Sequence, residues 1–91
     1  MAKGYLVDEA QQCIVFAMPA ARRIIRCAIS FGTLVECFGA APLSAAEGFP
    51  KNRLDIERIA AELISSGRLP DASGWIWVLG EDCGGGGPSA R

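Results

Sequence analysis

The sequence predicts an α+β domain whose elements follow the order strand, strand, helix, helix, strand. Apolar residues alternate with other residues in two segments between Gln11 and Ile29, which is the period of a β-strand. From Phe31 to about Ser66 the apolar spacing becomes helical, and Gly74–Gly80 is a run of β-forming residues bounded by glycines. We therefore expect a three-stranded, mainly antiparallel sheet with the helices on one face.

The length of the chain favours a single domain. The chain has 91 residues, of which 51% are hydrophobic, enough for one compact core. We assign residues 10–80 to this domain, residues 1–9 to an N-terminal arm, and residues 81–91, with their run of glycines, to a disordered tail. No apolar run approaches the ~20 residues of a membrane-spanning helix, and acidic residues stand where a signal peptide would be apolar.

The two alternating segments are expected to pair as a β-hairpin with a loop at Ala21-Arg22. Their apolar residues share one face when Met18 pairs with Ile25, Phe16 with Cys27, and Ile14 with Ile29. A shift by one residue would place Phe16 beside Arg26 and scatter the apolar face. Tight hairpin turns prefer Asn-Gly or Asp-Gly, so a wider loop around Ala21-Arg22 is the alternative.

Two helices are expected between the hairpin and the last strand. Ser30 is suited to cap the first helix, and Gly39 is suited to end it. The second helical stretch runs from Pro42 to about Ser66, and its residues 43–49 form a separate turn or a kinked first part. Pro50 suits the first position of the main helix.

The composition argues against several classes of function. Nine Lys and Arg residues against ten Asp and Glu residues give a net charge of -1, which removes the electrostatic basis for binding nucleic acid or an anionic membrane. The chain has no histidine, the commonest general base and metal ligand. It also lacks a P-loop and a dinucleotide-binding fingerprint. We therefore expect no enzymatic activity, no cofactor and no metal.

The cysteines are Cys13, Cys27, Cys37 and Cys83. They form no C-x-x-C pair of the kind that zinc sites use, and three of them lie in apolar runs, where a reduced cysteine packs as a small hydrophobic residue. We expect buried thiols in a reducing cytoplasm, with a redox or disulfide role and a metal site as alternatives. Redox sensing by Cys83 is disfavoured, because Glu81 and Asp82 should raise the pKa of its thiol.

Both faces of the predicted sheet are apolar. Whichever face the helices cover, the other retains apolar residues and carries either the two tryptophans or Ile76 and Val78. An antiparallel sheet facing water normally alternates apolar with polar residues, so an uncovered apolar face indicates a partner surface. Our candidate interface residues are Val15, Ile24, Arg26, Trp75 and Trp77. We favour self-association; the alternatives are an ordinary core role for the tryptophans and an aromatic platform for a ligand or single-stranded nucleic acid.

Asn52 and Arg53 project into the apolar face of the second helix, where a guanidinium needs partners because an unpaired buried charge is costly. One hypothesis makes the two residues a contact for an anionic ligand. The other, which we favour, has Arg53 extend past Phe49 to solvent or bond to carbonyl groups of its own chain.

Several segments follow one another in a recognisable order. Cys27-Ala28-Ile29-Ser30 leads into a helix with Leu34, and Phe49-x-x-Asn52-Arg53-x-x-Ile56-Glu57 lies in the second helix. With Phe16 and Gly74-Trp75-Ile76-Trp77, they resemble a bacterial domain-of-unknown-function family, numbered 1488, over about residues 10–79. The chain departs from the family at Ala21-Arg22, where members often have Asn-Gly or Asp-Gly, and at Gly32-Thr33, where they often have Glu-Ala. The resemblance implies a small α+β domain and brings no established activity.

We therefore expect an uncharacterised, cytoplasmic, non-catalytic module that forms a homo-oligomer or binds a protein partner through its sheet. Neither a membrane nor nucleic acid is expected as a partner. The alternative is a small module that binds an anionic ligand through Asn52 and Arg53.

Overall fold

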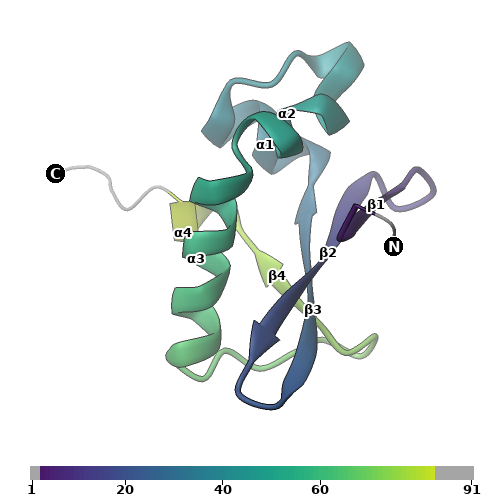
Figure 1. Cartoon of the computed structure of the whole chain (residues 1–91). Helices are drawn as coiled ribbons and strands as arrows, with labels where there is room; N and C mark the ends of the chain where they lie inside the picture. The colour runs from purple at the N-terminus through teal and green to yellow at the C-terminus, as the bar shows by residue number, and fades with distance from the viewer. Residues whose placement is uncertain (1–2, 84–91) are drawn as a thin grey trace, which may run out of the picture.

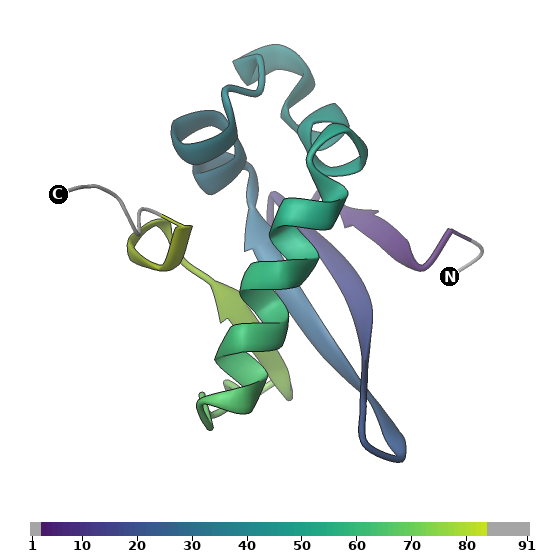
Figure 2. The same ribbon diagram turned by 60° about the vertical axis from the view of Figure 1, so that its left-hand side comes forward.

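Helices cover one face of a four-stranded β-sheet in the computed structural model, which describes residues 3–83 (Figures 1 and 2). The strands are β1 (Tyr5–Asp8), β2 (Cys13–Ala20), β3 (Arg23–Ser30) and β4 (Trp75–Val78). The helices are α1 (Phe31–Phe38), the 3₁₀ helix η1 (Pro42–Glu47), α2 (Gly48–Lys51), α3 (Arg53–Ser65) and α4 (Gly80–Cys83). The predicted α+β class is confirmed.

The strands lie in the order β1-β2-β3-β4. The first three pair antiparallel, whereas β4 pairs parallel to β3. A parallel pair needs a connection that returns along the sheet, and the segment from α1 to α3 provides it. Because α1, α2 and α3 all contribute buried residues to one core, they cover the same face, and no helix within residues 3–83 covers the other face (Figure 2).

The fourth strand corrects the prediction of three strands. It is β1, which lies in the predicted N-terminal arm and pairs with β2. The Asp8 carboxylate accepts the N–H of Gln11 at 3.0 Å and so stabilises the turn between them. The Tyr5–Val7 run has no alternation of apolar and polar residues, so the pattern did not indicate a strand.

The first three residues of the predicted disordered tail form part of a helix. Glu81–Cys83 lie in α4, and the predicted disorder of residues 84–91 falls outside the described residues.

The hairpin of β2 and β3 has the predicted register: Met18 pairs with Ile25, Phe16 with Cys27, and Ile14 with Ile29. Its loop is the two residues between Ala20 and Arg23, so the wider loop is wrong. Ala21 reaches the tight turn by adopting a φ of 54°, in the left-handed region. Alanine occupies this region at a steric cost that glycine avoids.

The predicted boundaries of α1 are confirmed. Ser30 Oγ accepts the N–H of Thr33 at 3.0 Å, and Gly39 ends the helix at a φ of 69°. The prediction for Pro50 is wrong, because Pro50 lies inside the short helix α2 and α3 begins at Arg53. Asn52, with a φ of -119°, separates the two helices. Proline fits within the first turn of α2, where its missing N–H costs no hydrogen bond.

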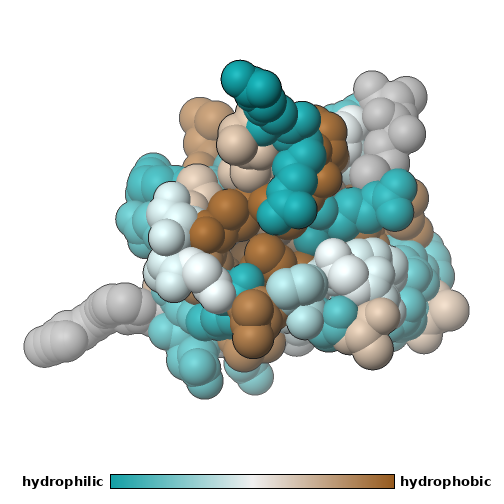
Figure 3. Space-filling view, turned by 90° about the horizontal axis from the view of Figure 1, so that it is seen from below, coloured by the Kyte–Doolittle hydropathy of each residue, from teal (hydrophilic) through white to brown (hydrophobic). Residues whose placement is uncertain are grey.

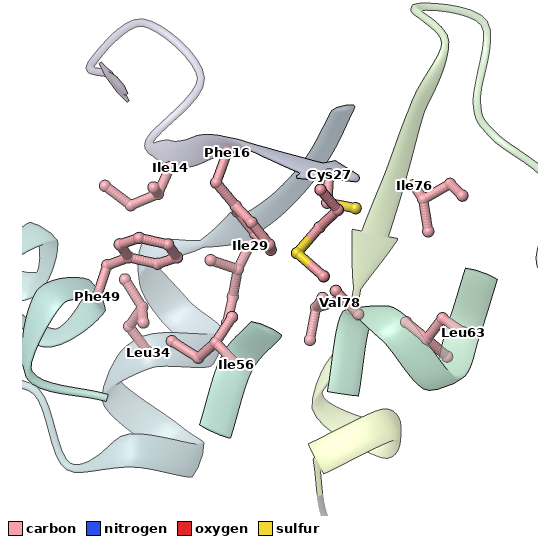
Figure 4. Close-up of a cluster of buried hydrophobic side chains, with 12 residues drawn as sticks. Ile14, Phe16, Cys27, Ile29, Leu34, Phe49, Ile56, Leu63, Ile76 and Val78 are labelled. Carbon is pink, nitrogen blue, oxygen red and sulfur yellow. The ribbon is translucent and has the colours of Figure 1, made fainter. Parts of the chain in front are cut away.

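A single core lies between the sheet and the helices (Figure 4). Phe49 from α2 packs against Phe16 of β2, with ring centroids 5.0 Å apart. Ile76 and Val78 of β4 point into this core (Figure 4). Because side chains alternate along a strand, Trp75 and Trp77 lie on the opposite face.

Candidate functional site

The face of the sheet turned away from the helices is the candidate site, and we call it the open face. Phe16, Cys27 and Ile76 are aligned across the sheet and point into the core, so their neighbours along each strand point the other way. The open face comprises Leu6, Asp8, Cys13, Val15, Ala17, Pro19, Ile24, Arg26, Ala28, Ser30, Trp75 and Trp77. The five residues predicted as an interface therefore all lie on one face.

These residues differ in how much surface they present. Ile24 is 64% exposed and Leu6 is 45% exposed, while both tryptophans are half-buried. Val15 is only 4% exposed and lies between Leu6 and Ala28 on the neighbouring strands. Val15 therefore forms the floor of the open face, and the larger side chains around it form the accessible apolar surface.

The two tryptophans form a fixed pair at the β4 side of the open face. Their ring centroids are 6.0 Å apart, with planes tilted by 49°. The indole N–H of Trp77 donates to Asp71 Oδ2 at 2.6 Å. The same carboxylate accepts the backbone N–H groups of Ser73 and Trp75 at 2.8 and 3.1 Å. Asp71 thus ties the ring of Trp77 to the loop that leads into β4.

These hydrogen bonds also change the pKa of the Asp71 carboxyl. The bond from Trp77, followed by the bond from the backbone of Trp75, lowers the pKa of the Asp71 carboxyl, because both stabilise its charged form. The carboxylate that orients Trp77 is therefore ionised at neutral pH.

Arg26 supplies a positive charge to the open face. It is exposed and pairs in register with Trp75 on β4. Within residues 3–83 the ion pairs involve Arg53, Arg58 and Arg68, so Arg26 has no ion-pair partner there.

Asn52 and Arg53 lie on the helical side of the molecule, away from the open face. Asn52 Nδ2 donates to the Gly48 carbonyl at 2.9 Å. Arg53 donates to Glu57 and to the Lys3 carbonyl, both at 2.8 Å, and its guanidinium lies 5.4 Å from the centre of the Tyr5 ring. These contacts favour the structural role of Arg53, because Glu57 of the same helix, together with Lys3 and Tyr5 in and before β1, supplies its partners.

All four cysteines are free thiols. Cys13 and Cys27 are buried, and burial raises the pKa of Cys27 to about 11. Burial and the neighbouring Cys37 thiol, with a smaller effect of Asp82, raise the pKa of Cys83 to about 12. The direction agrees with the prediction for Cys83, although burial is the larger cause. No group of three or more Cys, Asp or Glu side chains in the described part of the chain could hold a metal ion.

None of the helices within residues 3–83 has the length and apolar character needed to cross a lipid bilayer.

Comparison with known proteins places this fold in a family. A family model described as "Protein of unknown function (DUF1488)" matches residues 5–78, from the start of β1 to the end of β4. The chain belongs to the DUF1488 family. A solved structure of a DUF1488 protein of unknown function from Shewanella loihica PV-4 is similar, with a TM-score of 0.67 and 26% sequence identity. The similarity covers 81% of this chain and 84% of that chain. No curated protein matches the chain.

The DUF1488 match contains every residue of the open face as well as Asp71. Asp71 was not predicted as a site residue, although the sequence carries one signal for it. An aspartate followed by Ser73 and Gly74 is typical of a turn in which the side chain accepts backbone N–H groups. That signal predicts the turn but not the contact with Trp77, which depends on the path of the loop.

Proposed function

We propose that this DUF1488 chain is a non-catalytic module that self-associates, with two copies packing their open faces together. The observation that carries the proposal is the uncovered apolar surface formed by Leu6, Ile24, Trp75 and Trp77. A sheet that faced only water would place polar residues at these positions. Tryptophan is moreover one of the residue types enriched among the residues that anchor interfaces.

The charges on and around this face favour a second copy as the occupant. Arg26 contributes a cation, while Asp71 contributes a carboxylate beside Trp77. A two-fold interface brings the same patch of both copies together, so a patch that carries both signs can complement itself. The four free thiols fit a reducing cytoplasm as the place where the module works.

The size of the open face sets the expected strength of association. Strands about 4.8 Å apart, with a rise of about 3.3 Å per residue, give four strands at most roughly 500 Å² per copy. Two copies would then bury on the order of 1,000 Å², which is the lower end of specific interfaces. We therefore expect a reversible, concentration-dependent dimer.

Sedimentation velocity across the micromolar range tests the proposal. The unmodified chain should shift from monomer to dimer as its concentration rises. Trp75→Ser should weaken dimerisation at least ten-fold, because it removes an anchor without breaking the bond between Trp77 and Asp71. Circular dichroism should show that the variant keeps its secondary structure.

Leu54→Ser is the control, because Leu54 is apolar and 80% exposed but lies on α3, away from the open face. It should leave the dimerisation constant unchanged. A chain that stays monomeric at the highest concentration, or an equal effect of both substitutions, would overturn the proposal.

The anionic-ligand alternative has less support. Asn52 and Arg53 use their donor groups on Gly48, Glu57 and Lys3 of their own chain.

A further inference from the structure

A groove of about 600 Å³ opens at the end of the molecule where the loop between β2 and β3 lies. Figure 3 looks onto this end and shows apolar surface in the middle, bounded by hydrophilic residues. Ile25, Ile64, Leu69 and Ile76 contribute apolar surface to the groove. They come from β3, α3, the segment that follows α3, and β4.

One wall of this groove is an unpaired strand edge. β4 pairs only with Arg26–Ile29, so the first three residues of β3 extend beyond it. Ala17 donates its N–H to the Gly4 carbonyl, on the side of β2 away from β3. Ala17 and Arg26 are directly opposite each other, so the N–H and C=O of Arg26 likewise point away from the partner strand β2. Ile24, two residues before Arg26, points its N–H and C=O in the same direction, toward the groove.

The chain before β4 does not use this edge. Gly74, which would continue the ladder opposite Ile25, has a φ of 84° and donates its N–H to the Asp71 carbonyl instead. No hydrogen bond from the segment between α3 and β4 reaches the backbone of Ile24 in the described structure. Ile24 thus offers one N–H and one C=O, the pair by which a further strand can be added.

The charges at the rim of the groove are positive. Arg23 and Arg26 line it and are exposed, and neither has an ion-pair partner within residues 3–83. Arg68 also lines the groove, but its guanidinium is bound to Asp82 at 2.7 Å. The groove therefore combines an apolar floor, two available arginines and a strand edge.

We propose that this groove binds an extended segment of a partner protein in which apolar residues alternate with Asp or Glu. The segment adds to β3 as a short strand through the N–H and C=O of Ile24. Side chains of a strand alternate between its two sides, so apolar residues on the helix side reach the floor while carboxylates on the opposite side reach Arg26. Arg23, at the rim on the floor side, adds a second positive charge that attracts the acidic segment. A fatty acid would match the floor and the arginines but would leave the strand edge unused.

The test uses fluorescence anisotropy with a labelled decapeptide that alternates valine with glutamate. This peptide should bind at least ten-fold more tightly than the same peptide with lysine in place of glutamate. N-methylation of alternate backbone nitrogens should weaken its binding at least ten-fold, because it blocks strand addition. In amide NMR spectra the largest shift should fall on Ile24 and its neighbours.

The protein variants avoid the open face. Arg23→Gln combined with Leu69→Ser should weaken binding of the glutamate peptide at least ten-fold. Arg58→Gln combined with Leu54→Ser, on the exposed side of α3, should change it less than two-fold. The first double variant should dimerise like the unmodified chain, so a failure of peptide binding is distinguishable from a failure of the proposed dimer.

Three results would overturn the proposal. They are equal binding of the glutamate and lysine peptides, undiminished binding of the N-methylated peptide, and saturable binding of sodium laurate without any binding of the glutamate peptide. The last result would assign the groove to an acyl chain.

Discussion

Asp71 shows how a single residue determines the geometry of the open face. Its carboxylate bonds to the indole of Trp77 and to two backbone N–H groups, so the side chain and the loop before β4 hold each other in place. The position of Trp77 on a strand could be predicted from alternation with Ile76. The position of Asp71 could not, because it depends on a loop conformation that leaves no periodic pattern.

The titration of Asp71 should be visible in the fluorescence of Trp77. The chain has two tryptophans, so in a Trp75→Phe variant the signal reports on Trp77 alone. Because the pKa of Asp71 is lowered, the carboxylate and its bond to the indole should persist as the pH falls, and change only below the ordinary value of 3.8. A fluorescence titration with far-ultraviolet circular dichroism at each pH checks this.

The control for this titration is Asp71→Asn in the same Trp75→Phe background. It should lack the transition while retaining the secondary structure. A midpoint at or above pH 3.8, or a transition that survives in the asparagine variant, would contradict the role assigned to Asp71.

Among the elements, the hairpin of β2 and β3 was predictable to the residue, whereas β1 was not. In the hairpin, two alternating apolar sets admit only one register in which they share a face. β1 has four residues, and its Tyr5–Val7 run gives no alternation. Its place in the sheet depends on contacts distant in sequence, such as the packing of Tyr5 against Phe49 at 4.7 Å.

Replacing Ala21 in the turn of this hairpin with glycine should stabilise the protein. Ala21 has a φ of 54°, where a Cβ is unfavourable, so Ala21→Gly should raise the free energy of unfolding by about 0.5–1 kcal/mol. For a domain of this size that corresponds to a rise in Tm of roughly 2–8 °C. Thermal unfolding followed by circular dichroism measures the change.

Ala20→Gly provides the comparison, because Ala20 is the last residue of β2 and has an extended backbone. Glycine there should destabilise the protein. If Ala21→Gly also lowers the Tm, then the left-handed backbone conformation of Ala21 does not destabilise the protein.

At the scale of the whole molecule, the candidate site follows from the topology. The predicted interface residues share a face because of strand alternation, but which face is open depends on the path of the helices from β3 to β4. Since both faces of the sheet are apolar, composition did not distinguish them. The crossover places Ile76 and Val78 in the core and leaves the tryptophans outside.

The buried thiol of Cys27 should make the stability of the whole domain depend on pH in the alkaline range. Burial raises its pKa from 9.0 to about 11, so the folded state retains a proton that the unfolded chain releases. Stability should be constant below about pH 9 and fall by about 2–3 kcal/mol as the pH rises through 11. Urea unfolding under reducing conditions at a series of pH values measures this.

Cys27→Ala should make this alkaline decline shallower without abolishing it, because the pKa of Cys83 is also raised. Its stability at neutral pH will be lower because of the lost packing. Val78→Ala, in the same core, should lose a similar amount at neutral pH and keep the decline. An unchanged slope in Cys27→Ala would assign the pH dependence to other groups.

The parallel pairing of β4 with β3 has a consequence for how the chain folds. β1, β2 and β3 meet through short turns, whereas Arg26 and Trp75 come together only after about 50 intervening residues have been brought into place, which is entropically slow. Of the four described strands, β4 is the last to leave the ribosome. Both tryptophans therefore join the sheet late, and their fluorescence should follow the final step of folding.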